Sequence, residues 1–151
     1  MIQKYDFRKL SLSDLELVLQ MEKDFRSGFV VEENARQFLL NPNNWIFACI
    51  RDKRVIGFAY GYELNRLDSK GNMLYLHEVG VLREYQRQGI GLQILTNIKN
   101  LCKLTGICRF FLFTQKHNIA ACSLYEKVGG EKTSDGQDND VTYFFNISEK
   151  R

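Results

Sequence analysis

The chain has 151 residues, of which 44% are hydrophobic and 13% aromatic, and this length and composition fit one domain with a substantial core. Its 21 basic and 18 acidic residues leave a net charge of +3, which excludes the strongly basic composition of many nucleic-acid-binding proteins. No apolar run approaches the roughly 18 residues that a membrane span needs, and the start lacks the apolar segment of a signal peptide. We therefore expect a single cytoplasmic domain over residues 1–151, with no nucleic-acid or membrane partner.

The four cysteines do not indicate a metal site or a disulfide framework. Each lies singly within an apolar stretch, without a Cys-x-x-Cys pair or a histidine at the spacing of a zinc site. A free cysteine in such a setting behaves as a small buried hydrophobic residue. We therefore expect reduced core thiols and no bound metal. These cysteines are Cys49, Cys102, Cys108 and Cys122.

The N-terminal part of the chain predicts a short strand followed by two helices. The strand is expected within residues 3–10. Residues 13–16 read Ser-Asp-Leu-Glu, which is the pattern of a capping box at the start of a helix. A second, shorter helix is predicted over residues 32–40, and it ends before Pro42 because proline disfavours helical geometry in the residue that precedes it.

The middle of the chain predicts antiparallel strands. Residues 45–50 form a continuous apolar run, residues 51–53 are polar enough to turn the chain, and residues 55–60 form a second run. Two such runs around a short polar turn are typical of a β-hairpin. After a loop, residues 73–81 predict another strand.

The last third of the chain alternates between helices and strands. Apolar residues recur with the helical period over residues 91–106, and a buried strand is predicted at residues 109–114. Asn118 has the side chain of a helix cap and is followed by a further amphipathic segment. Alternation over residues 141–147 predicts a final strand, and one more strand near 131–134 stays open.

This order of elements predicts an α+β layered domain. An antiparallel meander early in the chain is followed by strand–helix–strand crossovers, which place neighbouring strands parallel. We therefore expect a mixed, mainly antiparallel central sheet of six to seven strands, with helices on both faces.

The segment over residues 79–91 carries the clearest chemical signal. It predicts a strand that runs through a short loop into a helix, with Gly89 and Gly91 at the helix start. The free N–H groups and the positive dipole end of a first helical turn bind phosphate oxygens, and glycine lets the backbone approach such a ligand. Arg83 and Arg87 add cationic side chains for an anionic ligand. Taken alone, the two glycines are weak evidence for a ligand, because they fit a tight strand–helix turn without a ligand better.

Two separated patterns resemble the GNAT superfamily of acetyltransferases. Gln-x-x-Gly-x-Gly over residues 86–91, between a Val-x-Val strand and a long helix, is similar to its acetyl-CoA motif. Asn-x-x-Ala-x-x-Leu-Tyr-x-x-Val-Gly over residues 118–129 is similar to its downstream helix. The two matches occur in the family's order, and the predicted order of elements also fits the family across the whole chain.

The resemblance implies a site for acetyl-CoA as co-substrate. The backbone of Val79 and Val81 is implied to pair with the pantetheine arm. Asn118 is implied to contact coenzyme A near its thiol, and Tyr125 to protonate the departing thiolate. From position alone, a tyrosine on an amphipathic helix fits a core residue as well. The residues implied to hold the pyrophosphate are Gln86, Arg87, Gln88, Gly89, Ile90 and Gly91.

Acetyl transfer requires a neutral amine, so an acceptor ammonium must lose a proton to a carboxylate or to water that relays it. Glu78 is the best candidate for this base. Alternation from Leu74 and Leu76 places Glu78 on an apolar face, where an unpaired carboxylate is costly. Either a β-bulge redirects Glu78 into the cleft, or the carboxylate has a buried partner. A structural ion pair is the competing interpretation.

Two further residues near Glu78 carry weaker functional signals. Glu63, at the end of the preceding strand, fits a role in lining the acceptor cleft and fits a solvated strand end equally. Histidine is a common catalytic residue type, but the alternation of His77 with Tyr75 and Val79 makes packing as good an interpretation as catalysis. We include Glu63 and Glu78 as substrate-binding candidates and leave His77 out.

Residues 57–64 and 74–81 resemble most the aminoglycoside 3-N-acetyltransferase branch, in which acidic residues stand at the places of Glu63 and Glu78. That resemblance implies transfer to a primary amine of a small cationic molecule, by direct attack in a ternary complex. The chain departs from the branch at residues 115–118, which read Gln-Lys-His-Asn, and at Asn146, since acidic residues are expected at both places.

These departures leave the acceptor open. A protein or peptide amine is one alternative, and a coenzyme A-binding regulatory domain without catalysis is another. A base and an acid beside one cleft argue against the second, because a pure binding domain needs neither. The sequence does not fix the oligomeric state, and a homodimer stays open.

Overall fold

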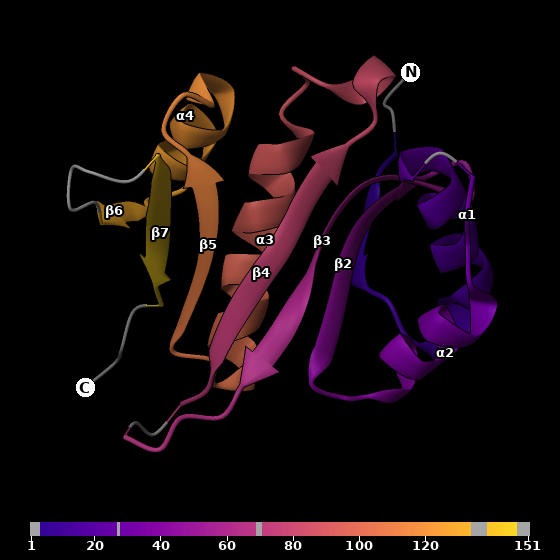
Figure 1. The fold of residues 1–151 in the computed structure, drawn as a ribbon, viewed down its shortest axis with the longest axis horizontal. Coiled ribbons are helices and arrows are strands. Elements are labelled where there is room, and N and C mark those ends of the chain that lie inside the picture. The colour runs from indigo at the N-terminus through magenta and orange to yellow at the C-terminus, as the bar shows by residue number, and fades with distance from the viewer. Residues whose placement is uncertain (1–3, 27, 69–70, 134–138, 148–151) are drawn as a thin grey trace.

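The computed structural model describes residues 4–26, 28–68, 71–133 and 139–147, and it shows one seven-stranded sheet with helices on both faces (Figure 1). The strand order is β1-β2-β3-β4-β5-β7-β6, and all neighbouring strands are antiparallel except β4 and β5. The predicted fold class is confirmed. The elements are β1 (Asp6–Lys9), η1 (Leu12–Asp14), α1 (Leu15–Phe25), α2 (Glu32–Leu40), β2 (Asn44–Arg51), β3 (Arg54–Leu64), β4 (Met73–Val81), η2 (Arg83–Tyr85), α3 (Ile90–Thr105), β5 (Arg109–Gln115), α4 (Ile119–Lys127), β6 (Glu131–Thr133) and β7 (Asp140–Asn146).

The predicted hairpin is β2 and β3, which pair from Asn44 with Tyr62 to Arg51 with Arg54. Its two-residue turn has left-handed backbone at both positions, with φ of 51° at Asp52 and 62° at Lys53. Such a turn matches the twist of two antiparallel strands. The turn therefore lies where the polar residues interrupt the apolar runs.

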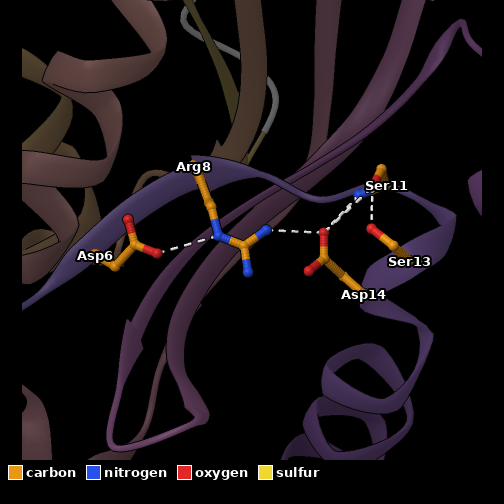
Figure 2. Close-up of polar contacts among 5 residues, drawn as sticks. All are labelled: Asp6, Arg8, Ser11, Ser13 and Asp14. Carbon is orange, nitrogen blue, oxygen red and sulfur yellow. Dashed lines mark hydrogen bonds and ion pairs between the residues drawn. The ribbon is translucent and has the colours of Figure 1, made fainter.

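The capping box lies two residues earlier than predicted. A 3-10 turn precedes α1, and the backbone N–H of Ser11 donates to Asp14 Oδ2 at 2.9 Å (Figure 2). Arg8 Nη1 donates to the same carboxylate oxygen at 2.8 Å, and Arg8 Nε donates to Asp6 Oδ2 at 3.1 Å. The capping box forms at Ser11 and Asp14 instead of at residues 13–16, because Arg8 on β1 adds a charge-assisted hydrogen bond to Asp14. This bond links the strand to the start of the helix.

Each face of the sheet has its own hydrophobic core. Helices α1 and α2 cover β2 and β3 on one face, and helices α3 and α4 cover the sheet on the other (Figure 1). The first core includes Val18, Met21, Ile46, Ala48 and Phe58. The second includes Trp45, Ile94, Leu95, Phe110 and Tyr143.

The cysteines divide into two groups. Cys49 and Cys102 are fully buried, and burial raises their thiol pKa to about 11 and about 12. Cys108 and Cys122 are only half-buried, so the expectation of four core thiols is correct for two of them. All four are free thiols.

The C-terminal elements follow the prediction closely. Gly106 ends α3 with a left-handed φ of 78°, and Asn118 Oδ1 caps α4 by accepting the N–H of Ala121 at 3.1 Å. The strand left open near 131–134 is β6, and residue 134 itself lies outside the described residues. Within the described ranges, no helix is long and apolar enough to cross a bilayer.

Candidate active site

The sheet opens between its two parallel strands. β4 pairs with β5 only over Met73–Tyr75 and Arg109–Phe111, although both strands continue well beyond these residues. Figure 1 shows the two strands side by side at the start of β4 and apart at its end. The backbone of the second half of β4 therefore has no strand partner on its β5 side among the described residues.

A groove of about 600 Å³ lies along this unpaired part of β4. Its walls are the end of β4, the turn into α3 and one side of α4, and we call it the β4–α4 groove. Both Val79 and Val81 line it. The other predicted cofactor residues that line it are Gln86, Arg87, Gly89, Ile90 and Gly91.

The turn before α3 has the backbone geometry of an anion cradle. Arg87 and Gly89 have left-handed φ of 62° and 79°, and α3 begins at Ile90. A Cβ added to Gly89 would meet no atom within 4 Å, so this turn faces open space. The free N–H groups at the start of a 16-residue helix point the same way as its positive dipole end. The turn can therefore hold a phosphate group on backbone atoms.

The second glycine of the motif has a different role. A Cβ at Gly91 would lie 3.1 Å from Leu124 Cδ2 of α4. Gly91 thus lets α3 and α4 approach each other at the wall of the groove, whereas Gly89 leaves room for a ligand.

Two predicted cofactor residues lie outside the groove lining that the structure describes. Gln88 Nε2 donates to the backbone oxygen of Glu84 at 3.2 Å, and Asn118 Oδ1 is used in the cap of α4. Gln86 lines the groove, but its side-chain amide donates to the carbonyl oxygen of Val81 at 3.0 Å. A ligand that pairs with Val81 can therefore share the carbonyl oxygen with Gln86, displace Gln86 or use the Val81 N–H.

Tyr125 lies in the wall of the same groove, on α4. Its side chain is 8% exposed, and its ring packs against Tyr143 with centroids 5.5 Å apart. Burial raises the pKa of the Tyr125 phenol. The hydroxyl is therefore protonated at neutral pH, as a general acid must be.

A β-bulge in β4 turns Glu78 away from the groove. Tyr60 of β3 pairs with Glu78 and the next residue, Gly61, pairs with Leu76, so His77 is the extra residue. A Cβ at Gly61 would overlap the carbonyl oxygen of Tyr75, so glycine is required opposite the bulge. The extra residue shifts the alternation, which keeps an apolar residue on the α3 face where Glu78 was otherwise expected.

A second cavity, of about 520 Å³, lies on the other face of the sheet. It is bounded by α1, α2, the segment between them and the middle of β3, and we call it the α1–α2 pocket. Most of its described lining is apolar or aromatic, and its only charged members there are Glu22 and Arg26. The larger apolar and aromatic members include Met21, Phe29, Val31, Phe38, Tyr60 and Tyr62.

Glu78 reaches this pocket through Arg26, which follows the last residue of α1. The two side chains form a fork: Arg26 Nη1 donates to Glu78 Oε2 at 3.2 Å, and Nη2 donates to Oε1. Arg26 Nε also contacts Glu22 Oε2 at 3.4 Å. The Glu78 side chain is 32% exposed, so it stays accessible from solvent. Of the two alternatives that the sequence offered, the bulge is present, whereas the charged partner Arg26 is 36% exposed and not buried.

A sequence model of the acetyltransferase (GNAT) family matches residues 10–130. The chain belongs to this family. A 76-residue segment is 34% identical to N-alpha-acetyltransferase 50 of zebrafish (Danio rerio), over 48% of this chain and 45% of the relative. The chain therefore spans just under half the length of that curated relative.

Several solved structures share the fold. Arabidopsis thaliana NAA60 bound to a bisubstrate analogue is 19% identical with a TM-score of 0.72, covering 95% of this chain and 98% of that one. The ribosomal-protein-S18-alanine N-acetyltransferase of Escherichia coli is 21% identical with a TM-score of 0.72, covering 98% and 97%. The aminoglycoside acetyltransferase meta-AAC0020, from an uncultured soil metagenomic sample, is 22% identical in its trehalose complex, with a TM-score of 0.75 and coverage of 86% and 91%.

The structure does not bring Glu63 to the face of the sheet on which Glu78 and the α1–α2 pocket lie. Glu63 lies on the α3 face, where Oε1 accepts from Trp45 Nε1 at 3.1 Å and Oε2 accepts from Asn72 Nδ2 at 2.8 Å. Trp45 belongs to the core under α3. The alternative interpretation, that Glu63 is a solvated strand end, does not hold, because Glu63 is half-buried and accepts hydrogen bonds from two donors.

His77 lies at the bulge on the pocket side of the sheet. Its Nδ1 is 3.0 Å from the Tyr75 hydroxyl, and its ring contacts Tyr60 and Tyr62.

The sequence signals for the pocket side of the sheet were weak. Arg26 has no motif around it, and the apolar segment that begins at Phe29 was the available sign of a binding surface.

Proposed function

We propose that this GNAT protein is an acetyl-CoA-dependent N-acetyltransferase whose acceptor amine is joined to an apolar group, such as the N-terminal amine of a polypeptide with an apolar first residue. One observation carries the proposal. Adjacent residues of β4 belong to opposite cavities, since Val79 lines the β4–α4 groove and Glu78 is bonded to Arg26 of the α1–α2 pocket. An acyl donor in the groove and an amine in the pocket would meet where β4 leaves β5.

The residues on the two sides divide the chemistry of transfer. Backbone groups around Gly89 hold the pyrophosphate of coenzyme A, and the ammonium loses its proton to Glu78 or to water bound there. The amine then forms a bond to the thioester carbonyl carbon, and the carbon–sulfur bond breaks. Tyr125 donates its proton to the sulfur that leaves, and it regains a proton through solvent from the nitrogen of the new amide, so the ammonium loses two protons in all, one to Glu78 or its water and one to the thiol. Each oxygen of a carboxylate has two lone pairs, so Glu78 can accept this proton while Arg26 stays bonded.

The pocket supports an apolar acceptor over a polycationic one. An aminoglycoside carries several ammonium groups, which need free carboxylates around them. Glu63 faces the other side of the sheet, and Glu78 is already paired with a guanidinium. Aromatic and aliphatic side chains instead offer a surface for a group of the same kind. The match to a curated N-alpha-acetyltransferase agrees with this acceptor.

The test is release of free thiol from acetyl-CoA in the presence of candidate amines. The panel contains peptides with leucine, methionine, lysine or aspartate at the first position, the same peptides with blocked N-termini, and aminoglycosides. We expect turnover with free N-termini next to an apolar side chain. Tyr125→Phe serves as the inactive control, with kcat lower by about 10²-fold or more because the general acid is lost.

Other outcomes contradict the proposal in distinct ways. Turnover with aminoglycosides alone would assign the pocket to polycations. Binding of acetyl-CoA without thiol release in any mixture would make the protein a coenzyme A-binding domain without catalysis.

A further inference from the structure

The acceptor side of this enzyme holds a small charge network with a net negative charge. Its members are Glu22, Arg26 and Glu78, of which Arg26 contacts both carboxylates. Two carboxylates and one guanidinium leave one negative charge in excess. The surrounding described side chains of the pocket are uncharged.

The charged residues nearby do not change this balance. Arg36 of α2 pairs with Glu32 at 3.2 Å and with Glu33 at 3.7 Å, and none of the three is among the described residues that line the pocket. Asp24 is occupied by Arg54, whose Nε lies 3.0 Å from Oδ2. The excess charge therefore lies with the network around Arg26.

We infer that Arg26 is a specificity-determining residue that limits the acceptor to a single positive charge. The inference rests on the proposed function. One ammonium balances the excess charge of the network, and the reacting amine supplies it. A second ammonium in the pocket would lie among apolar side chains beside the guanidinium of Arg26, where it has no free carboxylate and is repelled.

Arg26 achieves this through geometry as well as charge. Its planar fork holds both oxygens of Glu78, which fixes the carboxylate at the bulge, and its Nε contacts Glu22 on the preceding turn of α1. Arg26 itself follows the end of α1, so the helix end and the bulge are joined at one side chain.

Two matched acceptors isolate the effect of charge. One peptide begins with norleucine and the other with lysine, whose side chains have nearly the same shape but differ by one ammonium. The quantity measured is the ratio of kcat/KM for the norleucine peptide to kcat/KM for the lysine peptide. We expect the parent enzyme to prefer norleucine, and Arg26→Gln to lower the ratio about tenfold, as expected for one unit of charge at a half-exposed site.

Three further variants distinguish charge from structure. Arg26→Lys keeps the charge and should keep the ratio, even if kcat falls because the fork is lost. Arg36→Gln removes the same charge outside the pocket and should leave the ratio unchanged. The double variant Glu22→Gln with Arg26→Gln restores one negative charge in excess, and its ratio should return toward that of the parent.

The outcomes separate this inference from the proposed function. If no peptide is acetylated by the parent enzyme, the proposed function is wrong. If the parent acetylates the norleucine peptide but the ratio is the same in Arg26→Gln, the inference is wrong and the function stands. Should Arg26→Gln be inactive, a changed ratio in Arg26→Lys would overturn the inference and an unchanged one would support it.

Discussion

The β4–α4 groove and the α1–α2 pocket differ in the chemical groups that form them. The groove depends on backbone groups within one strand–turn–helix segment, with a glycine that leaves space for the ligand. The pocket depends on side chains from α1, α2 and β3, which are far apart in sequence. A backbone site leaves a short spacing pattern in the sequence, whereas a site made of side chains from separate elements leaves none.

The largest effect is expected at the groove. Gly89→Val places a branched side chain where the pyrophosphate would lie, at a left-handed φ of 79°. We expect acetyl-CoA affinity to fall about 100-fold, which corresponds to the loss of one or two charge-assisted hydrogen bonds. Calorimetric titration measures this directly.

Gly106 offers a matched control for that substitution. It has φ of 78° at the other end of α3, and a Cβ there also meets no atom within 4 Å. Gly106→Val therefore imposes the same backbone strain away from the groove, and acetyl-CoA affinity should be unchanged. Equal losses in the two variants would mean that strain in α3, and not the lost cradle, weakens binding.

A smaller effect is expected where the two sites meet, at the glycine opposite the bulge. Gly61→Ala forces the bulge to change and displaces Glu78, so kcat/KM for the acceptor should fall by at least about tenfold, while overpacking costs about 1–3 kcal/mol of stability. Acetyl-CoA affinity should stay near the parent value. The comparison is Gly57→Ala on the same strand, whose Cβ would meet Ile94 Cδ1 of α3 at 3.0 Å, away from the bulge. If both variants lose acceptor activity equally, the bulge has no special role.

A substitution in the α1–α2 pocket should change the kinetics less than a substitution in the β4–α4 groove. Phe29 is 79% exposed, so Phe29→Ala removes apolar surface from the pocket without opening the core. We expect the KM of an apolar acceptor to rise about three- to tenfold, because part of a phenyl group is lost from the contact. The melting temperature and the KM of acetyl-CoA should not move. Leu104→Ala, at an apolar residue that is 84% exposed on α3, should leave every parameter unchanged.

The smallest effect concerns stability and lies outside both cavities. Burial opposes ionisation of Asp14, but hydrogen bonds from Arg8 and Ser11 outweigh it and hold the Asp14 pKa below its ordinary value. Because the folded pKa is the lower one, this stabilisation is present above the unfolded pKa and is lost as the pH falls through the folded pKa. Asp14→Asn should lower the free energy of unfolding by about 1 kcal/mol at neutral pH.

Denaturant titrations at several pH values test both parts of that expectation. The difference between parent and Asp14→Asn should shrink below about pH 4, where the carboxylate of the unfolded chain is protonated. Asp6→Asn is the matched control, since Asp6 contacts the same arginine but is 61% exposed. A difference that grows at low pH would contradict the assigned role.

The sequence predicted the fold well because the informative signals are local. Asn118 and the turn after residue 50 lie where cap and turn chemistry place them, and the Gly89 turn has the predicted open geometry. The capping box was displaced because Arg8, six residues from Asp14, decides between two overlapping patterns. No pattern within a helix contains that information.

The α1–α2 pocket and its link to Glu78 were harder to predict because the contacts are long-range. Arg26 and Glu78 are 52 positions apart, and the bulge that brings them together depends on Gly61 of another strand. The surroundings of Glu63 were hard to predict for a related reason. Side chains of consecutive strand residues point to opposite faces, so Glu63 joins Trp45 while its neighbour Tyr62 lines the pocket.

The short pairing between β4 and β5 also has a mechanical meaning. Three residue pairs join a block of four strands to a block of three, so this seam has fewer paired residues than β2 with β3, β3 with β4 or β5 with β7. Amide protons along the unpaired part of β4 should exchange with solvent faster than those between β2 and β3. An extended ligand that forms hydrogen bonds with this edge would stabilise the sheet between β4 and β5. Slower amide exchange at Val79 and Val81 after addition of acetyl-CoA would show this stabilisation.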